Sequence, residues 1–385
     1  MTQAPTRESM LAAVQNLTPM IEAHAAEAET LRRPVDAVID ALRDTGVFMS
    51  YVPSRYGGLE IDTDTFIDVG LAVSQACTST GWVTTFYMEH NWMLAQFPTL
   101  TQDAIFGAQG YILAPASISP SGKANAVDGG YRLSGRWPWG TGVMHADWIL
   151  LNAMVEGTVP DPRMFLVPRS EIEVEDTWYA AGMEGTGSND MIAEDLFVPA
   201  ARSESLIAMA FGRGSGATGP CYRHPMLPLL TLAAGTPALG AARRALELFK
   251  ARLGERTLYG TPNKQAERPS AQILLGNCSA RLRSAETVLR AVGHEFSAWG
   301  DREAPCPTED RARMRVQVAQ VVQTCRDVVQ ALMQRSGAGA HMRTQPMQRL
   351  LRDINTLSCH TVFDEDLGGE NYGRILLGMD PASLA

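Results

Sequence analysis

The sequence predicts an α+β protein in which an N-terminal helical domain, a central β domain and a C-terminal four-helix bundle follow one another. Two observations support this order. Apolar residues recur at helical spacing before residue 110 and after residue 205, whereas the stretch between has short alternating runs and many turn residues. A chain of 385 residues is also longer than one ordinary domain. The expected boundaries are 1–110, 111–205 and 206–385.

The composition and charge argue against several classes of partner. Apolar residues make up 45% of the chain and charged residues 19%, which is typical of a globular protein with a large core. The net charge of −9, with Lys and Arg scattered, argues against binding to nucleic acid or to an acidic membrane surface. The most apolar segment, 226–242, is interrupted by Pro228 and Pro237 and is too short to cross a bilayer.

The cysteines and the first residues favour a cytoplasmic protein. The six cysteines lie far apart without paired spacing, which indicates free thiols in a reducing compartment and neither disulfides nor a zinc site. The first residues lack the basic and then apolar pattern of a secretion signal. We therefore expect a cytoplasmic location, with no membrane or nucleic-acid partner.

The N-terminal domain is predicted to consist of helices. Two apolar runs with helical spacing lie within residues 7–46, and two more helices are expected over 62–97. The last of these helices carries Trp82, Phe86 and His90, each four residues after the one before. This spacing should place the three rings on one face of the helix.

The central domain shows the signals of short strands joined by turns. Asp128-Gly129 is typical of a hairpin turn, and strands are expected over 148–155 and 164–167. A tight loop at 182–190 should precede the last strand. These elements predict a compact β domain.

The C-terminal domain is predicted to be a bundle of long helices. Long apolar-periodic runs joined by short links are typical of that architecture. The runs cover 228–252, 268–298, 308–337 and 344–362.

One glycine motif matches a nucleotide-binding pattern as a string of letters. Gly214-Ser-Gly216-Ala-Thr-Gly219 fits the dinucleotide fingerprint, but no clear strand precedes it and Pro220 follows it. We interpret it as a flexible loop between the β domain and the bundle.

The most informative segment is Ser134–Trp148, which holds three of the seven tryptophans of the chain. Between them lie Gly140, Thr141 and Gly142, which allow close approach of the backbone and offer N–H and hydroxyl donors. Aromatic walls above a floor of small residues suit a planar heteroaromatic cofactor. The alternative is a strand and a turn whose tryptophans fill a core.

Two histidines and one arginine are further candidates. His90 lies on an apolar helix, where most histidines are only core residues. His360 is followed four residues later by Asp364, which could fix its tautomer. Arg256 could equally be a solvated charge at a helix end. The seven histidines form no His-x-x-x-His or Glu-x-x-His pair, so we expect no metal site.

Four motifs in order resemble the acyl-CoA dehydrogenase superfamily over nearly the whole chain. Each is weak alone, but their order along the chain is fairly specific. The motifs are Tyr51-Val-Pro-Ser-Arg-Tyr-Gly-Gly, Gly129-Gly-Tyr-Arg-Leu-Ser-Gly-Arg-Trp, Gly182-Met-Glu-Gly-Thr-Gly-Ser-Asn-Asp and Tyr372-Gly-Arg-Ile-Leu-Leu-Gly. The resemblance implies an acyl-CoA dehydrogenase-like fold that assembles as a homotetramer.

Within that superfamily the chain looks more like the flavin-dependent monooxygenase branch. That branch holds the oxygenase components of two-component aromatic hydroxylases, such as those acting on 4-hydroxyphenylacetate or on a secosteroid phenol. It typically reads Gly-Arg-Trp-x-Phe-x-Ser-Gly where this chain has Trp139 in place of Phe and Thr141 in place of Ser. The acid-bearing Tyr-Glu-Gly-Thr of a dehydrogenase is absent near the C-terminus.

The resemblance implies a reaction, a cofactor and a partner. Reduced flavin, FMNH2 or FADH2, would come from a separate flavin reductase and react with O2 to give a C4a-hydroperoxide. This species decays if water reaches it, so it needs a dry and preorganised cavity. The substrate would be a small aromatic molecule, phenolic or indolic.

The resemblance also assigns roles to residues. His90 would be the general base, and His360, oriented by Asp364, would stabilise or protonate the peroxide, although the two histidines could exchange these roles. The Thr141 hydroxyl and nearby N–H groups would bind the flavin N5 region. The predicted cofactor-binding residues are Trp82, Trp139, Gly140, Thr141, Gly142 and Arg256, the last for the charge of the flavin or its phosphate.

Three alternatives remain open from the sequence. The first is an N- or S-oxygenase of the same branch, which would share every motif. The second is an acyl-CoA dehydrogenase that uses bound FAD. The third is a non-catalytic binding protein that kept the fold, which the change from Ser to Thr at position 141 permits.

Overall fold

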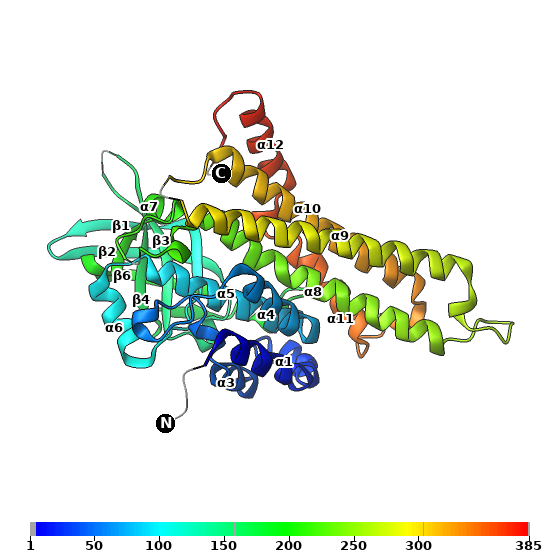
Figure 1. Cartoon of the computed structure of the whole chain (residues 1–385). Coiled ribbons are helices and arrows are strands. Elements are labelled where there is room, and N and C mark those ends of the chain that lie inside the picture. The colour runs from blue at the N-terminus through cyan, green and yellow to red at the C-terminus, as the bar shows by residue number, and fades with distance from the viewer. Residues whose placement is uncertain (1–4, 158, 217, 303, 384–385) are drawn as a thin grey trace.

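The computed structural model describes residues 5–157, 159–216, 218–302 and 304–383. A seven-stranded sheet lies at one end of the molecule, and the three longest helices run away from it (Figure 1). The chain is therefore α+β, with every strand between Ala116 and Ser205, as the sequence predicts.

The N-terminal segment forms helices that begin at polar caps. The Thr6 and Ser9 side chains cap α1 reciprocally, and the Asp62 carboxylate accepts the Thr65 N–H at the start of α4. The helices are α1 (Arg7–Ala23), α2 (Ala25–Leu31), α3 (Asp36–Asp44), α4 (Thr63–Ala76), α5 (Thr78–Ala95) and α6 (Thr99–Gln109). Residues 7–46 thus hold three helices instead of the predicted two, because the backbone leaves helical geometry at His24.

Helix α5 is the central helix of the fold. All of its residues are buried except Phe86, which is partly exposed. A helix buried on all sides packs against several neighbours at once, and α5 contacts α4, α8 and η5 (Glu184–Thr186). It therefore links the helical segments to the end of the sheet.

The strands form one mixed sheet in the order β5-β6-β2-β1-β3-β4-β7. Among the described strands, only the β1–β3 pair is parallel, and the other pairs are antiparallel. The strands are β1 (Ala116–Val127), β2 (Gly130–Gly140), β3 (Trp148–Val155), β4 (Asp161–Pro168), β5 (Glu173–Glu175), β6 (Asn189–Pro199) and β7 (Ser203–Ser205). The predicted hairpin turn at Asp128-Gly129 is confirmed, since Val127 pairs with Gly130 across it.

Each of the four predicted C-terminal runs is a helix. Pro269 and Pro346 occupy first helical positions, where their missing N–H groups have no partner to lose. The helices are α8 (Met226–Glu255), α9 (Pro269–Gly300), α10 (Thr308–Arg335) and α11 (Pro346–Leu357), and α12 (Glu365–Leu376) follows them.

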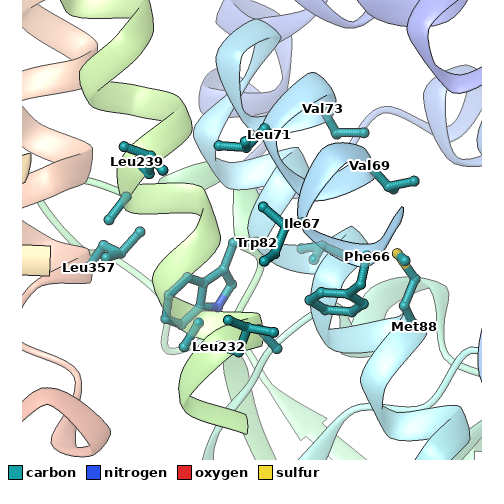
Figure 2. Packing of buried hydrophobic residues seen from close by; sticks show 14 of the residues in the cluster. Phe66, Ile67, Val69, Leu71, Val73, Trp82, Met88, Leu232, Leu239 and Leu357 are labelled. Carbon is teal, nitrogen blue, oxygen red and sulfur yellow. The ribbon is translucent and has the colours of Figure 1, made fainter. Parts of the chain in front are cut away.

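The two helical segments share one hydrophobic core, and the sheet has a second core of its own. In the helical core, Trp82 of α5 lies among Leu232, Leu239 and Leu357, which come from α8 and α11 (Figure 2). Packing therefore joins the first and last thirds of the chain around the β domain that interrupts them.

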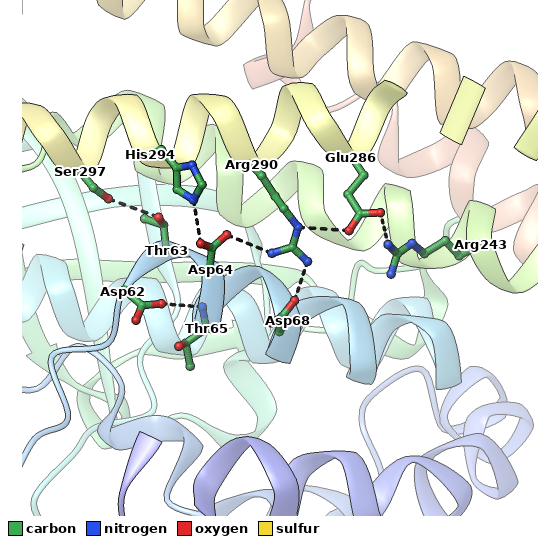
Figure 3. A network of polar contacts seen from close by, with 10 residues as sticks. All are labelled: Asp62, Thr63, Asp64, Thr65, Asp68, Arg243, Glu286, Arg290, His294 and Ser297. Carbon is green, nitrogen blue, oxygen red and sulfur yellow. Dashed lines mark hydrogen bonds and ion pairs between the residues drawn. The ribbon is translucent and has the colours of Figure 1, made fainter. Parts of the chain in front are cut away.

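A polar network on the surface strengthens the same junction (Figure 3). Arg290 of α9 donates to Asp64 at 3.0 Å and to Asp68 at 2.6 Å, both on α4, and to Glu286 at 3.1 Å. Glu286 also binds Arg243 of α8. Networks of several charges hold geometry better than isolated surface pairs do.

The glycine motif at 214–219 is not a free linker. The Gly214 N–H donates to the Gln96 side chain and the Gly216 N–H to the Gln96 carbonyl oxygen, both at 3.0 Å. Around these two glycines the chain forms neither helix nor strand, which agrees with the predicted loop, and the two hydrogen bonds attach it to the end of α5. Among the described helices, none has the length and apolar character needed to cross a membrane.

Candidate active site

A cavity of about 260 Å³ lies where α5, the end of the sheet and α11 meet. This volume is close to the lower end of the roughly 300–1,000 Å³ of small-molecule sites. Most of the lining is aromatic or apolar, with several hydroxyls on one side. The lining residues are Trp82, Phe86, Ala116, Trp139, Thr141, Trp178, Met183, Thr186, Ser188, Thr356, Leu357, Cys359, His360 and Thr361.

Aromatic rings form the walls of the cavity. Trp82 and Phe86 of α5 stack with their ring centroids 4.6 Å apart, and the His360 ring meets Trp82 edge-on at 5.5 Å. Trp178 and Trp139 also line the cavity, and Trp139 is 65% exposed. Flat walls of this kind bind a planar ligand through stacking.

Trp139 reaches the cavity because the β2 backbone is distorted there. The β2–β6 register shifts between Trp137 and Gly140, and Trp139 has a φ of 64°. A left-handed conformation costs a residue other than glycine about 1–2 kcal/mol. Strain of this sort concentrates at functional sites.

The turn after β2 is held by its own hydrogen bonds. The Thr141 N–H donates to the Trp139 carbonyl at 2.8 Å, the Gly142 N–H donates to the Thr186 carbonyl at 3.0 Å, and the Tyr87 hydroxyl donates to the Gly142 carbonyl. Gly142 has a φ of 77°, and a Cβ there would lie 2.5 Å from the Tyr87 hydroxyl. The prediction that these N–H groups are free to bind a cofactor is therefore wrong for Thr141 and Gly142.

The two predicted glycines serve packing and do not line the cavity. A Cβ on Gly140 would lie 2.7 Å from the Met191 sulfur, and Gly142 faces Tyr87. Their small size lets the end of β2 approach its neighbours closely, which places Trp139 and Thr141 at the cavity.

Three buried hydroxyls form a chain along one side of the cavity. The Thr141 Oγ1 lies 3.0 Å from the Ser188 Oγ, which lies 2.8 Å from the Thr186 Oγ1. The Thr186 hydroxyl donates to the Met183 carbonyl at 2.8 Å. At the other end, the Trp82 indole N–H donates to the Thr141 Oγ1 at 3.4 Å.

The Met183 end of this row of hydroxyls is held by the C-terminal helices. The Met183 N–H donates to the Asp353 carboxylate of α11 at 2.7 Å, and the Trp178 indole donates to the Met183 carbonyl at 3.0 Å. Burial raises the pKa of Asp353 to about 6. Hydrogen bonds to the Met183 backbone thus connect the Trp178 wall and the row of hydroxyls to α11.

His360 lies at the cavity with a defined tautomer. Its Nδ1 accepts the Val362 N–H at 3.2 Å, so in the neutral ring the proton is on Nε2. Arg315 of α10 donates to the Thr361 and Val362 carbonyls, both at 3.0 Å, and fixes this short turn, η10 (Thr361–Phe363). Burial, assisted by the Arg315 charge, lowers the pKa of His360 to about 4, which keeps the ring neutral near pH 7.

The prediction that Asp364 orients His360 is wrong. The four-residue spacing would bring the two side chains together only on a continuous helix, but α11 ends at Leu357 and His360 has a ψ of 137°. The Asp364 carboxylate instead caps α12, where it accepts the Leu367 N–H at 2.8 Å.

His90 has the opposite tautomer and lies behind the wall. Its Nδ1 is 2.6 Å from the Ala114 carbonyl oxygen, which can only accept, so Nδ1 carries the proton and Nε2 has the lone pair, 3.3 Å from the Glu89 Oε2. Burial lowers the pKa of His90 to about 4. His90 is not among the cavity-lining residues, and Phe86 meets its ring edge-on at 5.5 Å.

Glu89 is a buried acid that the sequence reasoning missed. It is 0% exposed, neither carboxyl oxygen has a hydrogen-bond partner in the described part of the chain, and Oε2 lies 3.3 Å from the His90 Nε2. Burial raises its pKa well above the usual value, so the carboxyl holds its proton to a higher pH than an exposed glutamate. A glutamate on a mostly apolar helix, directly before His90, was the available signal in the sequence.

Arg256 lies away from this cavity. It follows α8, and its guanidinium donates to the Gln265 side chain at 3.3 Å and to the Arg335 carbonyl at 3.4 Å. Within one chain it therefore holds the loop between α8 and α9. Among the described residues, no group of His, Cys, Asp and Glu side chains has the arrangement of a metal site.

Comparisons with known proteins agree with this geometry. Residues 232–365 match the family model described as acyl-CoA dehydrogenase, C-terminal domain. The "Pigment production hydroxylase" of Rhodococcus sp. is 34% identical, with 97% of each chain covered. The "Flavin-dependent monooxygenase, oxygenase subunit HsaA" of Mycobacterium tuberculosis is 32% identical, with 97% of this chain and 96% of that protein covered.

A solved structure and two more relatives extend the likeness. XiaF from Streptomyces sp., in complex with FADH2 and glycerol, superposes with a TM-score of 0.91 at 28% identity over 98% of this chain and 97% of that chain. A resorcinol hydroxylase oxygenase component of Rhizobium sp. and an indole-3-acetate monooxygenase of Pseudomonas putida are each 30% identical over at least 94% of both chains. The chain therefore belongs to the acyl-CoA dehydrogenase superfamily, in the branch of flavin-dependent monooxygenases.

Proposed function

We propose that this monooxygenase is the oxygenase component of a two-component system and hydroxylates a small phenolic or indolic substrate. It takes reduced FMN or FAD from a separate reductase. The observation that carries the proposal is the cavity, where Trp82 and Trp139 flank a row of hydroxyls and the His360 imidazole. The names of the relatives, which include hydroxylases of resorcinol and of indole-3-acetate, support the substrate class.

The residues of the cavity fit a flavin. Trp82, Trp139 and Trp178 provide flat surfaces for its ring system, and Thr141 provides a polar atom at the edge. When bound, reduced flavin supplies the two electrons with which O2 is activated for transfer of one oxygen atom. The aromatic lining keeps water away from that reaction, which limits loss of the oxidising equivalent as peroxide.

The opposite tautomers support different roles for the two histidines. His90 offers the Nε2 lone pair, so it is the base that takes the proton of a phenol or indole and makes the ring carbon more nucleophilic. His360 offers its Nε2–H, so it donates a hydrogen bond to oxygen at the flavin. Because Phe86 lies against both rings, it must turn aside for a substrate to reach His90.

The assembly and the location are part of the proposal. We propose a homotetramer in the cytoplasm, in which a second copy covers the exposed Trp139 and in which Arg256 serves the flavin phosphate of a neighbouring subunit. The six cysteines are unpaired in the structure, as a reducing compartment requires. Light scattering that gave the mass of one 41.8-kDa chain would contradict the assembly.

Mixing experiments test the function directly. The protein is combined anaerobically with reduced FMN or FAD and then with oxygenated buffer and resorcinol, 4-hydroxyphenylacetate or indole-3-acetate. We expect flavin reoxidation to yield a hydroxylated product, with little hydrogen peroxide. Peroxide without product from every aromatic substrate would contradict the proposal, and bleaching of bound oxidised FAD by an acyl-CoA would indicate a dehydrogenase.

Replacement of His360 by asparagine should uncouple the reaction. The asparagine carbonyl can still accept the Val362 N–H and hold η10, but the Nε2–H donor is lost. Removing one such donor costs about 100-fold in related electrostatic sites, so we expect most of the reduced flavin to be consumed as hydrogen peroxide. Product and peroxide are measured per flavin oxidised. Unchanged coupling in a folded variant would exclude the assigned role.

A further inference from the structure

We infer that the Thr141–Ser188–Thr186 hydroxyl chain has a fixed direction, which makes the site select reduced flavin over oxidised flavin. The inference rests on the proposed function, in which Thr141 meets the flavin N5. It adds Ser188 and Thr186, which the sequence reasoning did not assign, as residues that determine this selection.

The direction follows from counting hydrogen atoms. The Met183 carbonyl can only accept, so the single hydroxyl hydrogen of Thr186 is used there. Thr186 must then accept from Ser188, and Ser188 must accept from Thr141. The Thr141 oxygen also accepts from the Trp82 indole, which can only donate. What remains on Thr141 is one lone pair.

Burial makes this direction matter. Thr141, Ser188 and Thr186 are 8%, 3% and 1% exposed, so solvent water cannot readily compensate for a hydroxyl that points the wrong way. The Met183 carbonyl also accepts from the Trp178 indole at 3.0 Å and from the Thr186 N–H at 3.1 Å, so it keeps partners whichever way the hydroxyls point. Reversing the row of hydroxyls would instead set the lone pairs of the Thr186 and Met183 oxygens against each other at 2.8 Å and require all three hydroxyls to turn together.

The two redox forms of flavin differ at the atom that meets such a lone pair. Reduced flavin carries a hydrogen on N5, whereas oxidised flavin has only a lone pair there. The free lone pair of Thr141 therefore accepts from the reduced form and repels the oxidised form. A site of this kind takes up the cofactor that a reductase delivers and releases it after turnover.

Thr186→Val tests the inference, because valine keeps the shape of the side chain and removes the hydroxyl that sets the direction. Ser188 can then donate to Thr141, which frees the Thr141 hydrogen to point into the cavity. We expect oxidised flavin to bind about ten-fold more tightly and reduced flavin to change little. The midpoint potential of bound flavin should then fall by about 30 mV, since ten-fold in the affinity ratio is about 30 mV for two electrons.

Matched variants make the result specific. Ser188→Ala also frees the Thr141 hydrogen and should act in the same direction. Thr141→Val should also lower the ratio of the affinity for reduced flavin to the affinity for oxidised flavin, but it should do so by weakening the binding of reduced flavin. The control is Thr84→Val, which removes a buried hydroxyl of α5 that only donates within its helix to Thr80, and it should change neither affinity.

The affinities are measured by fluorescence titration of oxidised flavin and by anaerobic titration of reduced flavin, on variants shown by thermal melting to be folded. The quantity compared is the affinity for reduced flavin divided by the affinity for oxidised flavin. If this ratio in Thr186→Val and Ser188→Ala stays within two-fold of the wild-type ratio, or rises, the inference is overturned while the monooxygenase function remains in place. A wild-type protein that bound neither redox form would instead overturn the proposed function, and this inference with it.

Discussion

Replacement of His90 by asparagine should lower hydroxylation at least 100-fold while the protein stays folded. The asparagine amide can donate to the Ala114 carbonyl as Nδ1 does now, so the packing of α5 against Ala114 is kept. What is lost is the Nε2 lone pair, and a general base typically contributes about 10²–10⁴-fold. Product formed per reduced flavin is the measurement, with thermal melting to confirm the fold.

The reduced flavin should still be oxidised in this variant, with hydrogen peroxide in place of product. His294→Asn is a suitable control, since His294 pairs with Asp64 at the surface of α9, outside the cavity, and should leave coupling unchanged. If the His90→Asn variant hydroxylated the substrate at the wild-type rate, another group than His90 would have to accept the substrate proton.

Glu89→Gln should stabilise the protein, and more so as the pH rises. Glutamine resembles the protonated carboxyl, the form that burial favours in the folded protein. In the unfolded chain the glutamate has its usual pKa near 4.5. Between that value and the raised folded value, the folded protein holds a proton that the unfolded chain has released, so wild-type stability falls with rising pH.

The size of the effect follows from this linkage. The advantage of the variant should grow by about 1.4 kcal/mol per pH unit until the folded pKa is reached, and then level off. Urea unfolding at several values between pH 5 and pH 8.5 measures it, with Glu171→Gln on the exposed surface as the control for removing a carboxylate. A stability difference that did not vary with pH would contradict the assignment of a buried, protonated acid.

Local periodicity predicted most helices because it reports the face that each segment buries. The second of the two helices expected over 62–97 is α5, Thr78–Ala95, and the run over 228–252 is α8, Met226–Glu255. Periodicity does not report which segments pack together, so the sequence did not show that α4 and α5 share one core with α8.

The site residues could be predicted where the neighbouring sequence alone indicates that a residue lies at the cavity. Trp82, Trp139, Thr141 and His360 line the cavity, because α5, the end of the tryptophan-rich strand and the C-terminal turn meet there. Asp364 was misplaced because the helix that its spacing assumed ends before His360.

Other site features depend on contacts between distant segments. The role proposed for Ser188 and Thr186 depends on their hydrogen bonds with Thr141, which is 47 residues before Ser188. The protonation of the Glu89 carboxyl depends on its burial by segments on all sides. No local pattern encodes either relation, so only the folded structure brings them into view.

The interrupted helical core has a consequence for synthesis on the ribosome. The strands between Ala116 and Ser205 have their own core and can fold once they emerge, whereas α4 and α5 must wait for α8. During that interval the apolar surface of α5 is open to chaperones. Since the cavity proposed for the flavin is built from α5, the end of the sheet and α11 together, we expect flavin to bind only after these segments have packed.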